Sequence, residues 1–299
     1  MNEIYAADPS VCRHVSELKL LLASFGPYTG RYLANYPTDW ISLVEKNFDN
    51  FGEIEVARVK TILRRAKENM TIVTRTNLAW DPAQTWLENA KPLLNTVPVL
   101  FDGLIAQQAL PPSIHHLHDL DFPPTSEERI PGIASEYARV SKVLMLLSPE
   151  LVLVDPYLNP AKRSYAPVLE VIFSIAAKGK CRKISLWARA SELFKSCEQS
   201  SIKSELKDSI YQLALNSGFN SSREIEMILV EDEKSQAKMH GRYLLSIKGG
   251  IRFDQGFQKL PEGRRVDVGP IGKEIHNKLL DIYFDGKHDM QHERLVIKL

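Results

Sequence analysis

The stretch of sequence that decides the fold is ELVLVDPYLNP, at residues 150–160. A short apolar run that ends in Asp155-Pro156 is typical of a buried strand that continues into a loop. Working outward, the pattern predicts a helix that ends at about Leu147. The other elements expected nearby are helices at 166–177 and 201–216 and strands at 183–188 and 224–230. Alternation of strand and helix at this spacing predicts a mainly parallel sheet covered by helices.

Beyond the third strand the chain departs from this alternation. Residues 239–246 and 250–253 are expected to form two adjacent strands, joined by a tight turn through Lys248-Gly249-Gly250. An apolar stripe over 271–282 predicts a last helix, and 294–299 a last strand. The segment 132–299 is therefore predicted to be an α/β domain with a mixed sheet flanked by helices.

Residues 1–110 are predicted to form a mainly α-helical N-terminal domain. Apolar residues recur at helical spacing over 11–22, 40–48 and 54–63, and Asp81-Pro82 is expected to open another helix. A short strand is expected at 71–75. We attribute the apolar stripes to core packing rather than to a cofactor site, because burial alone demands this spacing.

A proline-rich stretch at 111–131 is interpreted as the linker between the two domains, since four prolines between 111 and 124 break any sustained period. The linker also carries side chains with the ligand chemistry of a zinc site, namely His116, His118, Asp119 and Asp121. A closed zinc site needs about four ligands in fixed geometry. Solvated or locally hydrogen-bonded side chains are the favoured interpretation, and no metal site is assigned.

The composition is that of an ordinary globular protein of 299 residues, 44% hydrophobic and 25% charged. Residues 1–131 hold 12 Lys+Arg and 16 Asp+Glu, whereas 132–299 hold 26 and 21, so only the second part favours a polyanion, and modestly. The three scattered cysteines, Cys12, Cys181 and Cys197, indicate a reducing compartment and are interpreted as inert core residues. Apolar runs far shorter than the ~20 residues that span a bilayer, and a start unlike a signal peptide, lead us to expect a cytoplasmic protein without a transmembrane segment.

The residues with the clearest chemistry lie in the strand expected at 239–246. Because side chains alternate along a strand, His240 and Arg242 are expected to project from one face. The arginine fork suits phosphate oxygens, and imidazole can act as a nucleophile, an acid or a hydrogen-bond donor near neutral pH. Glycines at the adjoining turn let backbone amides approach an anion, and further cations flank the strand. The other residues assigned to this phosphate-binding site are Gly249, Gly250, Lys238 and Arg252.

Together these stretches resemble the phospholipase D superfamily, whose signature is His-x-Lys-x4-Asp followed by a small Gly/Ser turn. The resemblance is closer to a divergent branch, the phospholipase-D-like C-terminal domain of MIT-domain-containing proteins and related prokaryotic proteins. The matching stretches are Val154-Asp155-Pro156-Tyr157-Leu158, His240-Gly241-Arg242-Tyr243-Leu244, Gly249-Gly250-Ile251 and Gly256-Phe257-Gln258. The resemblance covers about residues 132–299 and implies a phospholipase-D-like arrangement there.

The chain departs from that signature at two positions. Arg242 stands where the signature has Lys, Ile247 stands where it has Asp, and the motif occurs once. In catalytic members one histidine attacks phosphorus and a second protonates the leaving oxygen. The resemblance therefore implies His240 as a nucleophile only in a homodimer that brings two copies together. Without a carboxylate to orient His240, it implies phosphate recognition more than cleavage.

Two residues of the Asp-Pro-Tyr stretch are assigned to the rim of the site. Asp155 ends a predicted parallel strand, where α/β sheets place their ligands. It is equally suited to capping the turn that follows, because Asp favours turn starts. Tyr157 lies in the same loop.

We therefore expect a degenerate phospholipase-D-like protein that recognises phosphate groups of nucleic acid or of acidic phospholipid and uses no cofactor. Prokaryotic chains of this kind are expected in defence or mobile-element gene clusters. The alternative is a dimeric, metal-independent phosphodiesterase or nuclease with His240 as its nucleophile, and a third is a structural subunit whose His240 and Arg242 meet no ligand. The N-terminal domain is expected to contact a protein partner.

Overall fold

The computed structural model describes residues 3–75, 78–96, 100–122, 126–194, 199–220, 222–233, 235–236 and 238–299. Contacts divide the chain into two compact units, residues 2–125 and 126–299. The boundary between them falls within the proline-rich stretch. Residues 123–125 of that stretch lie outside the described part of the chain.

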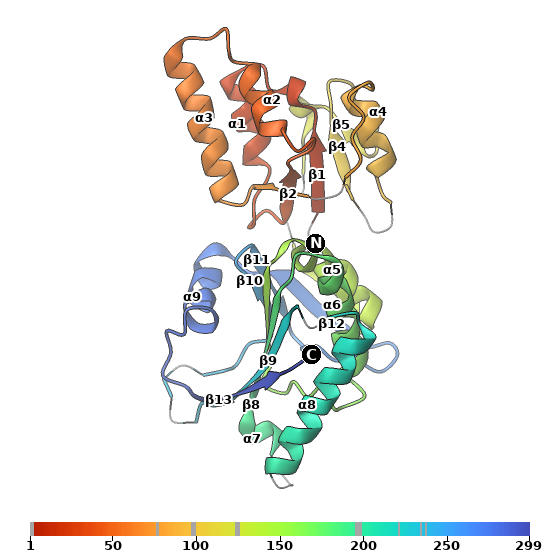
Figure 1. The fold of residues 1–299 in the computed structure, drawn as a ribbon, viewed down its shortest axis with the longest axis vertical. Coiled ribbons are helices and arrows are strands. Elements are labelled where there is room, and N and C mark those ends of the chain that lie inside the picture. The colour runs from red at the N-terminus through yellow and green to blue at the C-terminus, as the bar shows by residue number, and fades with distance from the viewer. Residues whose placement is uncertain are drawn as a thin grey trace. The chain divides into compact units, whose positions relative to one another are not determined.

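The first unit is built on a parallel sheet rather than mainly on helices (Figure 1). Its strands are β1 (Glu3–Ala7), β2 (Arg31–Ala34), β3 (Ile72–Val73), β4 (Gly103–Ile105) and β5 (Ile114–His115). Within the described residues they form one five-stranded sheet in the order β3-β2-β1-β4-β5, with every pairing parallel. The predicted mainly α-helical domain is thus corrected to α/β, and part of the predicted linker is strand β5.

Helices connect and cover these strands. They are α1 (Val15–Ala23), α2 (Trp40–Lys46), α3 (Glu53–Glu68) and α4 (Trp86–Ala90), with short 3-10 turns at Pro9–Val11, Lys91–Leu93 and Leu117–Asp119. The first three helices coincide with the predicted apolar stripes, which pack into one core with β1 and β2. Strand β3 lies within the strand expected at 71–75. The other four strands escaped prediction because they are two to five residues long and their residues are almost all buried, so no alternation marks them.

The second unit holds an eight-stranded mixed sheet in the order β13-β9-β8-β7-β10-β11-β12-β6. Its strands are β6 (Glu128–Pro131), β7 (Glu150–Val154), β8 (Lys183–Arg189), β9 (Glu224–Glu231), β10 (Tyr243–Ser246), β11 (Gly249–Phe253), β12 (Arg265–Pro270) and β13 (Gln291–Ile297). Its helices are α5 (Ala134–Leu147), α6 (Ala166–Lys178), α7 (Ala190–Leu193), α8 (Gln199–Asn216) and α9 (Lys273–Tyr283). The parallel part is β7, β8 and β9, as predicted, and the other pairings are antiparallel.

Both faces of this sheet are covered, which explains why β7 is apolar from Leu151 to Val154. Leu151 and Leu153 pack into the core formed with α5, α6 and α8. Val152 and Val154 pack into a second core with α9, on the other side of the sheet (Figure 1). Successive side chains of a strand point to opposite faces, so a central strand covered on both sides needs an apolar residue at every position.

Among the helices of the described ranges, none combines the length and the apolar character needed to cross a membrane. Cys12 and Cys181 are buried without a disulfide, and burial raises the pKa of both thiols to about 12. Cys197, the third expected core cysteine, lies outside the described residues.

Candidate functional site

Asp155 is the centre of the candidate site, at the carboxyl end of β7. It is fully buried, and its carboxylate accepts hydrogen bonds from the backbone N–H of Tyr157 at 2.9 Å and of Phe257 at 3.2 Å. The hydroxyl of Tyr165 also donates to it, at 3.4 Å. Asp155 therefore caps the Pro-Tyr turn, and it also ties that turn to a loop 102 residues further along the chain.

The protonation of Asp155 is set by opposing effects. Burial raises the pKa of this carboxyl above its usual value, because a charge loses solvation in the interior. The two backbone hydrogen bonds and the nearby charge of Arg242 act in the other direction. Burial is the larger influence, so the site holds a carboxylate that binds its proton more readily than an exposed aspartate.

Arg242 lies against this buried carboxylate and against an aromatic ring. Its Nε is 3.6 Å from Asp155 Oδ1, and its Nη1 donates to the carbonyl of Asp254 at 2.6 Å. The guanidinium carbon lies 5.3 Å from the centroid of the Tyr157 ring, within range of a cation–π contact. The Arg242 side chain is 28% exposed and Tyr157 is 44% exposed. The pair therefore presents a fixed guanidinium and an aromatic surface to solvent.

Gly256 makes this arrangement sterically possible. A Cβ at this position would lie 2.0 Å from Asp155 Oδ2 and 2.9 Å from Arg242 Cδ. Its φ of +70° is in the left-handed region, which residues with a side chain adopt only at a cost. The Gly-Phe segment recognised in the sequence thus has a local physical role beside Asp155 and Arg242.

Three exposed cations lie on the two loops that contribute Tyr157 and Phe257 to this cluster. The loop that follows β7 carries Lys162 and Arg163, and the loop that follows β11 carries Lys259. The two loops lie side by side, because Lys259 N donates to the carbonyl of Ser164 at 2.6 Å. Within the described part of the chain no ion pair neutralises these three side chains, which we call the rim cations. Sequence reasoning counted Lys259 among the cations that flank the strand expected at 239–246 without assigning it to the site, and it missed Lys162 and Arg163, although each follows a predicted strand.

The other predicted site residues are not gathered at Arg242. The strand begins at Tyr243 rather than Met239, so His240 and Arg242 do not share a strand face. His240 is exposed, and no described residue forms a hydrogen bond or ion pair with it. The strand predicted at 239–246 begins too early, because residues 238–242 belong to the connection between β9 and β10. In this connection Met239 N donates to the Asp232 carboxylate rather than to a neighbouring strand.

Both glycines of the predicted phosphate turn lie at the far end of the hairpin. Tyr243, which follows Arg242, pairs with Arg252, whereas Ser246 pairs with Gly249. Gly249 therefore lies three residues, or about 10 Å of strand, from the end of the hairpin next to Arg242. A Cβ at Gly250 would lie 2.8 Å from a methyl group of Ile271, so this glycine serves close packing.

The two flanking cations are engaged elsewhere. The Lys238 ammonium donates to the backbone carbonyls of Asp232 and Glu233, at 2.7 and 2.6 Å. The Arg252 guanidinium pairs with Glu127 on the exposed surface. Strand alternation alone could not place these side chains, because Lys238 precedes the strand and turns back onto residues 232 and 233, whereas the partner of Arg252 comes from a segment 125 residues away.

An ion pair braces the neighbouring strand ends. Arg189, the last residue of β8, donates from Nε and Nη2 to the two carboxylate oxygens of Asp232 at 2.9 and 3.0 Å. Burial alone would raise the pKa of Asp232, but hydrogen bonds from Arg189 and from Met239 N hold it below its usual value. The backbone N–H of Arg189 also donates to the carbonyl of Pro156, which connects this brace to the Asp155 loop.

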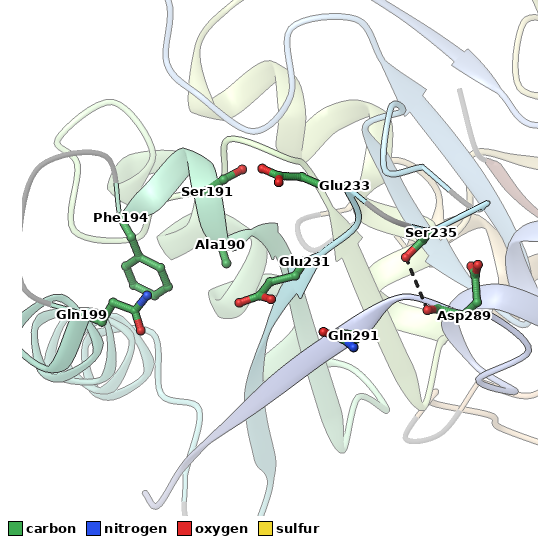
Figure 2. A pocket seen from close by; sticks show the side chains of 9 residues that line it. All are labelled: Ala190, Ser191, Phe194, Gln199, Glu231, Glu233, Ser235, Asp289 and Gln291. Atoms are coloured by element: carbon green, nitrogen blue, oxygen red, sulfur yellow. Dashed lines mark hydrogen bonds between the residues drawn. The ribbon is translucent and has the colours of Figure 1, made fainter.

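A cavity of about 450 Å³ opens at the carboxyl ends of β8 and β9 (Figure 2). The residues that line it include Phe194, Gln199, Glu231, Glu233, Asp289 and Gln291. A smaller cavity of about 200 Å³ shares Phe194, Gln199, Glu231 and Gln291 with it and reaches Glu293. We call the two together the β9 groove. Its described lining carries carboxylates and no lysine or arginine, so it does not suit a phosphate. Sequence reasoning did not identify this groove; the run Glu231-Asp232-Glu233, directly after the strand predicted at 224–230, is the signal that could have indicated it.

His116 contacts its sequence neighbours, whereas His118 also reaches helix α1, where its Nε2 lies 3.8 Å from Oε1 of Glu17. His118 N donates to His116 Nδ1 at 3.4 Å, and His116 Nδ1 lies 3.9 Å from a carboxylate oxygen of Asp119. Within the described ranges no three His, Cys, Asp or Glu side chains are grouped so that they could hold a metal ion.

Comparison with known proteins assigns no family. No protein-family model matches the sequence, and no functionally curated protein matches it. Among solved structures, the chain is similar to the archaeal chromatin protein TrmBL2, whose structure is described as showing a novel mode of DNA binding. The identity is 13%, the match covers 83% of this chain and 70% of that one, and the TM-score is 0.31. At this TM-score the likeness carries no argument about fold or function.

Proposed function

We propose that the second unit binds the phosphate backbone of single-stranded nucleic acid, with Arg242 as the residue that contacts phosphate. The observation that carries the proposal is the position of this guanidinium, held by the buried Asp155 and stacked on the exposed Tyr157. One of its N–H donors binds Asp254 among the described residues, and an arginine has five donors, so donors are left for a phosphate.

The surroundings of Arg242 support a polyanion as the ligand. The rim cations lie on two adjoining loops, the same loops whose Tyr157 and Phe257 bind Asp155, and they add positive charge to this part of the surface. Tyr157 supplies an exposed aromatic face, and stacking of bases on aromatic side chains is a main source of affinity for single strands. This combination favours nucleic acid over an acidic phospholipid surface, where an aromatic platform has no base to meet.

The proposal is one of binding rather than cleavage. Among the described residues, no carboxylate orients His240, so none of them prepares its imidazole for attack on phosphorus. The dimeric phosphodiesterase, the homodimer and the protein partner of the first unit stay predictions from the sequence.

The test measures binding of a labelled single-stranded oligonucleotide by fluorescence anisotropy over a range of salt concentrations. Replacing the rim cations together, as Lys162→Gln, Arg163→Gln and Lys259→Gln, should weaken binding roughly tenfold or more and lower the salt slope by about two, since each phosphate contact on a single strand contributes about 0.7. Arg242→Lys should weaken binding because the bidentate fork is lost while the charge remains.

The matched control is Lys207→Gln, which removes an exposed charge on α8 and should change little. An unchanged salt slope in the triple variant would contradict the proposal. Binding to phosphatidylserine vesicles but not to the oligonucleotide would replace nucleic acid by lipid. His240→Ala should retain oligonucleotide affinity; if the protein hydrolyses phosphodiesters and this variant loses turnover, the enzyme alternative is correct.

A further inference from the structure

The ion pair between Arg189 and Asp232, the Arg189–Asp232 brace, holds both backbone groups of Met239. Arg189 Nη2 donates to the Met239 carbonyl at 2.6 Å, and the Asp232 carboxylate accepts the Met239 N–H at 2.7 Å. In a sheet, a neighbouring strand makes such a pair of bonds. Here two side chains make them, and they fix Met239 although it precedes the first residue of β10.

Met239 is the last firmly held residue before Arg242. In the described part of the chain, neither His240 nor Gly241 makes a backbone hydrogen bond. On the other side, the carbonyl of Arg242 accepts the N–H of Phe253 at 3.0 Å. The backbone of Arg242 is thus fixed by the hairpin on one side and, across two residues, by the brace on the other.

The backbone of Arg189 holds the second half of the same site. Its N–H donates to the Pro156 carbonyl at 3.1 Å, in the loop that carries Asp155 and Tyr157. These two side chains are the ones that lie against Arg242. One residue at the end of β8 is therefore tied both to the loop with the carboxylate and the aromatic ring and to the segment with the guanidinium.

The brace supports the proposed phosphate-binding side chain from below the surface. The side chain of Arg189 is 19% exposed and that of Asp232 is 3% exposed, and the hydrogen bonds of this guanidinium go to protein acceptors. The side chain of Met239 is fully buried in the core shared with α9, so it keeps the segment attached when the brace is weakened. Loss of the brace should therefore change the position of Arg242 more than the fold.

We propose that Arg189 and Asp232 are positioning residues for nucleic-acid binding, which fix Met239 and thereby hold Arg242 where it meets a phosphate. This inference rests on the proposed function. Charge alone predicts the opposite effect for Asp232, because removal of a carboxylate makes the unit more positive and should favour a polyanion. The two explanations differ in the sign of one measurement.

The test measures oligonucleotide affinity by fluorescence anisotropy for variants of the full chain that circular dichroism shows to be folded. Asp232→Asn removes the charged acceptor, and Arg189→Lys keeps the positive charge but loses the fork that reaches two acceptors together. Both should weaken binding roughly two- to tenfold, the cost of ordering a side chain that the free protein no longer holds. In an Arg242→Ala background the same changes should have little effect, because they act through that guanidinium.

A second measurement follows Arg242 without any ligand. The Nε–H signal of Arg242 in a nitrogen–proton correlation NMR spectrum reports its position beside Asp155, and Arg242→Lys assigns it. We expect this signal to shift in Asp232→Asn and in Arg189→Lys. The matched control is Asp208→Asn, which removes an exposed carboxylate on α8 and should change neither the signal nor the affinity.

Three results would overturn the proposal. They are tighter binding by Asp232→Asn, an unshifted Arg242 signal in both brace variants, and an undiminished loss of affinity in the Arg242→Ala background. A shifted signal together with an Arg242→Lys affinity equal to that of the parent has a different meaning. It would reject nucleic-acid binding through Arg242, while the control of its position by the brace would stand.

Discussion

At the scale of single residues, the site depends most on a position without a side chain. Gly256 passes so close to Asp155 that a Cβ would overlap the carboxylate oxygen. The same carboxylate orders Tyr157 and Phe257 through their backbone N–H groups and lies beside Arg242. One added methyl group would therefore disturb the pairing of a buried charge and the placement of both loops.

Gly256→Ala is expected to destabilise the second unit more than a positive φ alone can explain. The left-handed backbone costs a non-glycine residue about 1–2 kcal/mol, and the overlap with Asp155 should add roughly 2 kcal/mol. Gly263→Ala is the matched control, because Gly263 has a φ of +78° and no atom within 4 Å of its Cβ position. Urea unfolding of the two variants gives the comparison. Equal losses of stability would show that contact with Asp155 is unimportant.

At the scale of secondary-structure elements, loops after parallel strands are joined to one another by buried polar side chains. The brace between Arg189 and Asp232 connects the end of β8 to the segment after β9. The Asp232 carboxylate also accepts a hydrogen bond from the backbone N–H of Met239. The Arg189 guanidinium donates to the backbone carbonyl of Met239 at 2.6 Å. The irregular segment that leads into Arg242 is therefore anchored through this ion pair rather than through a strand ladder.

Asp232→Asn is expected to destabilise the protein by about 2 kcal/mol at pH 7, because hydrogen bonds to a charged acceptor are lost. The pKa of Asp232 is lowered from its ordinary 3.8 in the folded state. Its contribution is therefore present above pH 3.8 and is lost as the pH falls through the lowered folded-state value. Urea unfolding at pH 7 and at pH 3 should show a difference from the parent that shrinks in acid.

Asp208→Asn is the control for this effect, since Asp208 is exposed on α8. It should have little influence on stability at either pH. A loss for Asp232→Asn that stays constant from pH 7 to pH 3 would show that the carboxylate charge does not stabilise the brace.

At the scale of the whole molecule, the chain consists of two units that each have a sheet and a core of their own. One core joins the parallel sheet of the first unit to α1, α2 and α3. The cores of the second unit lie on the two faces of its mixed sheet. Every residue of the Arg242 cluster, of the rim cations and of the β9 groove belongs to the second unit.

Residues 126–299 expressed alone are therefore expected to fold cooperatively and to bind the oligonucleotide within about threefold of the full chain, because a unit with its own core can fold independently. Thermal unfolding followed by circular dichroism, together with anisotropy, measures both properties. A folded fragment that has lost its affinity would show that the first unit contributes to binding.

What could be predicted from the sequence differs between the two units for a physical reason. In the second unit, strands of five to eight residues alternate with long helices, and local apolar patterning was enough to predict β7, β8 and β9. In the first unit, β3 and β5 have two residues each. β3 lies within the strand expected at 71–75, whereas a segment as short as β5 has no measurable period, and only its neighbours in the sheet make it a strand.

By itself, the sequence determined the elements whose pattern is local: the helix stripes, the buried strands, and Asp155 at the end of one of them. Only the tertiary structure decided which distant residues lie next to one another. It placed Arg242 beside Asp155, moved Gly249 and Gly250 to the far end of a hairpin, left His240 exposed and assembled the β9 groove. The reason is that periodicity reports which face of a segment is buried, whereas side-chain pairing across 87 residues, as between Asp155 and Arg242, depends on which strands the sheet sets next to one another.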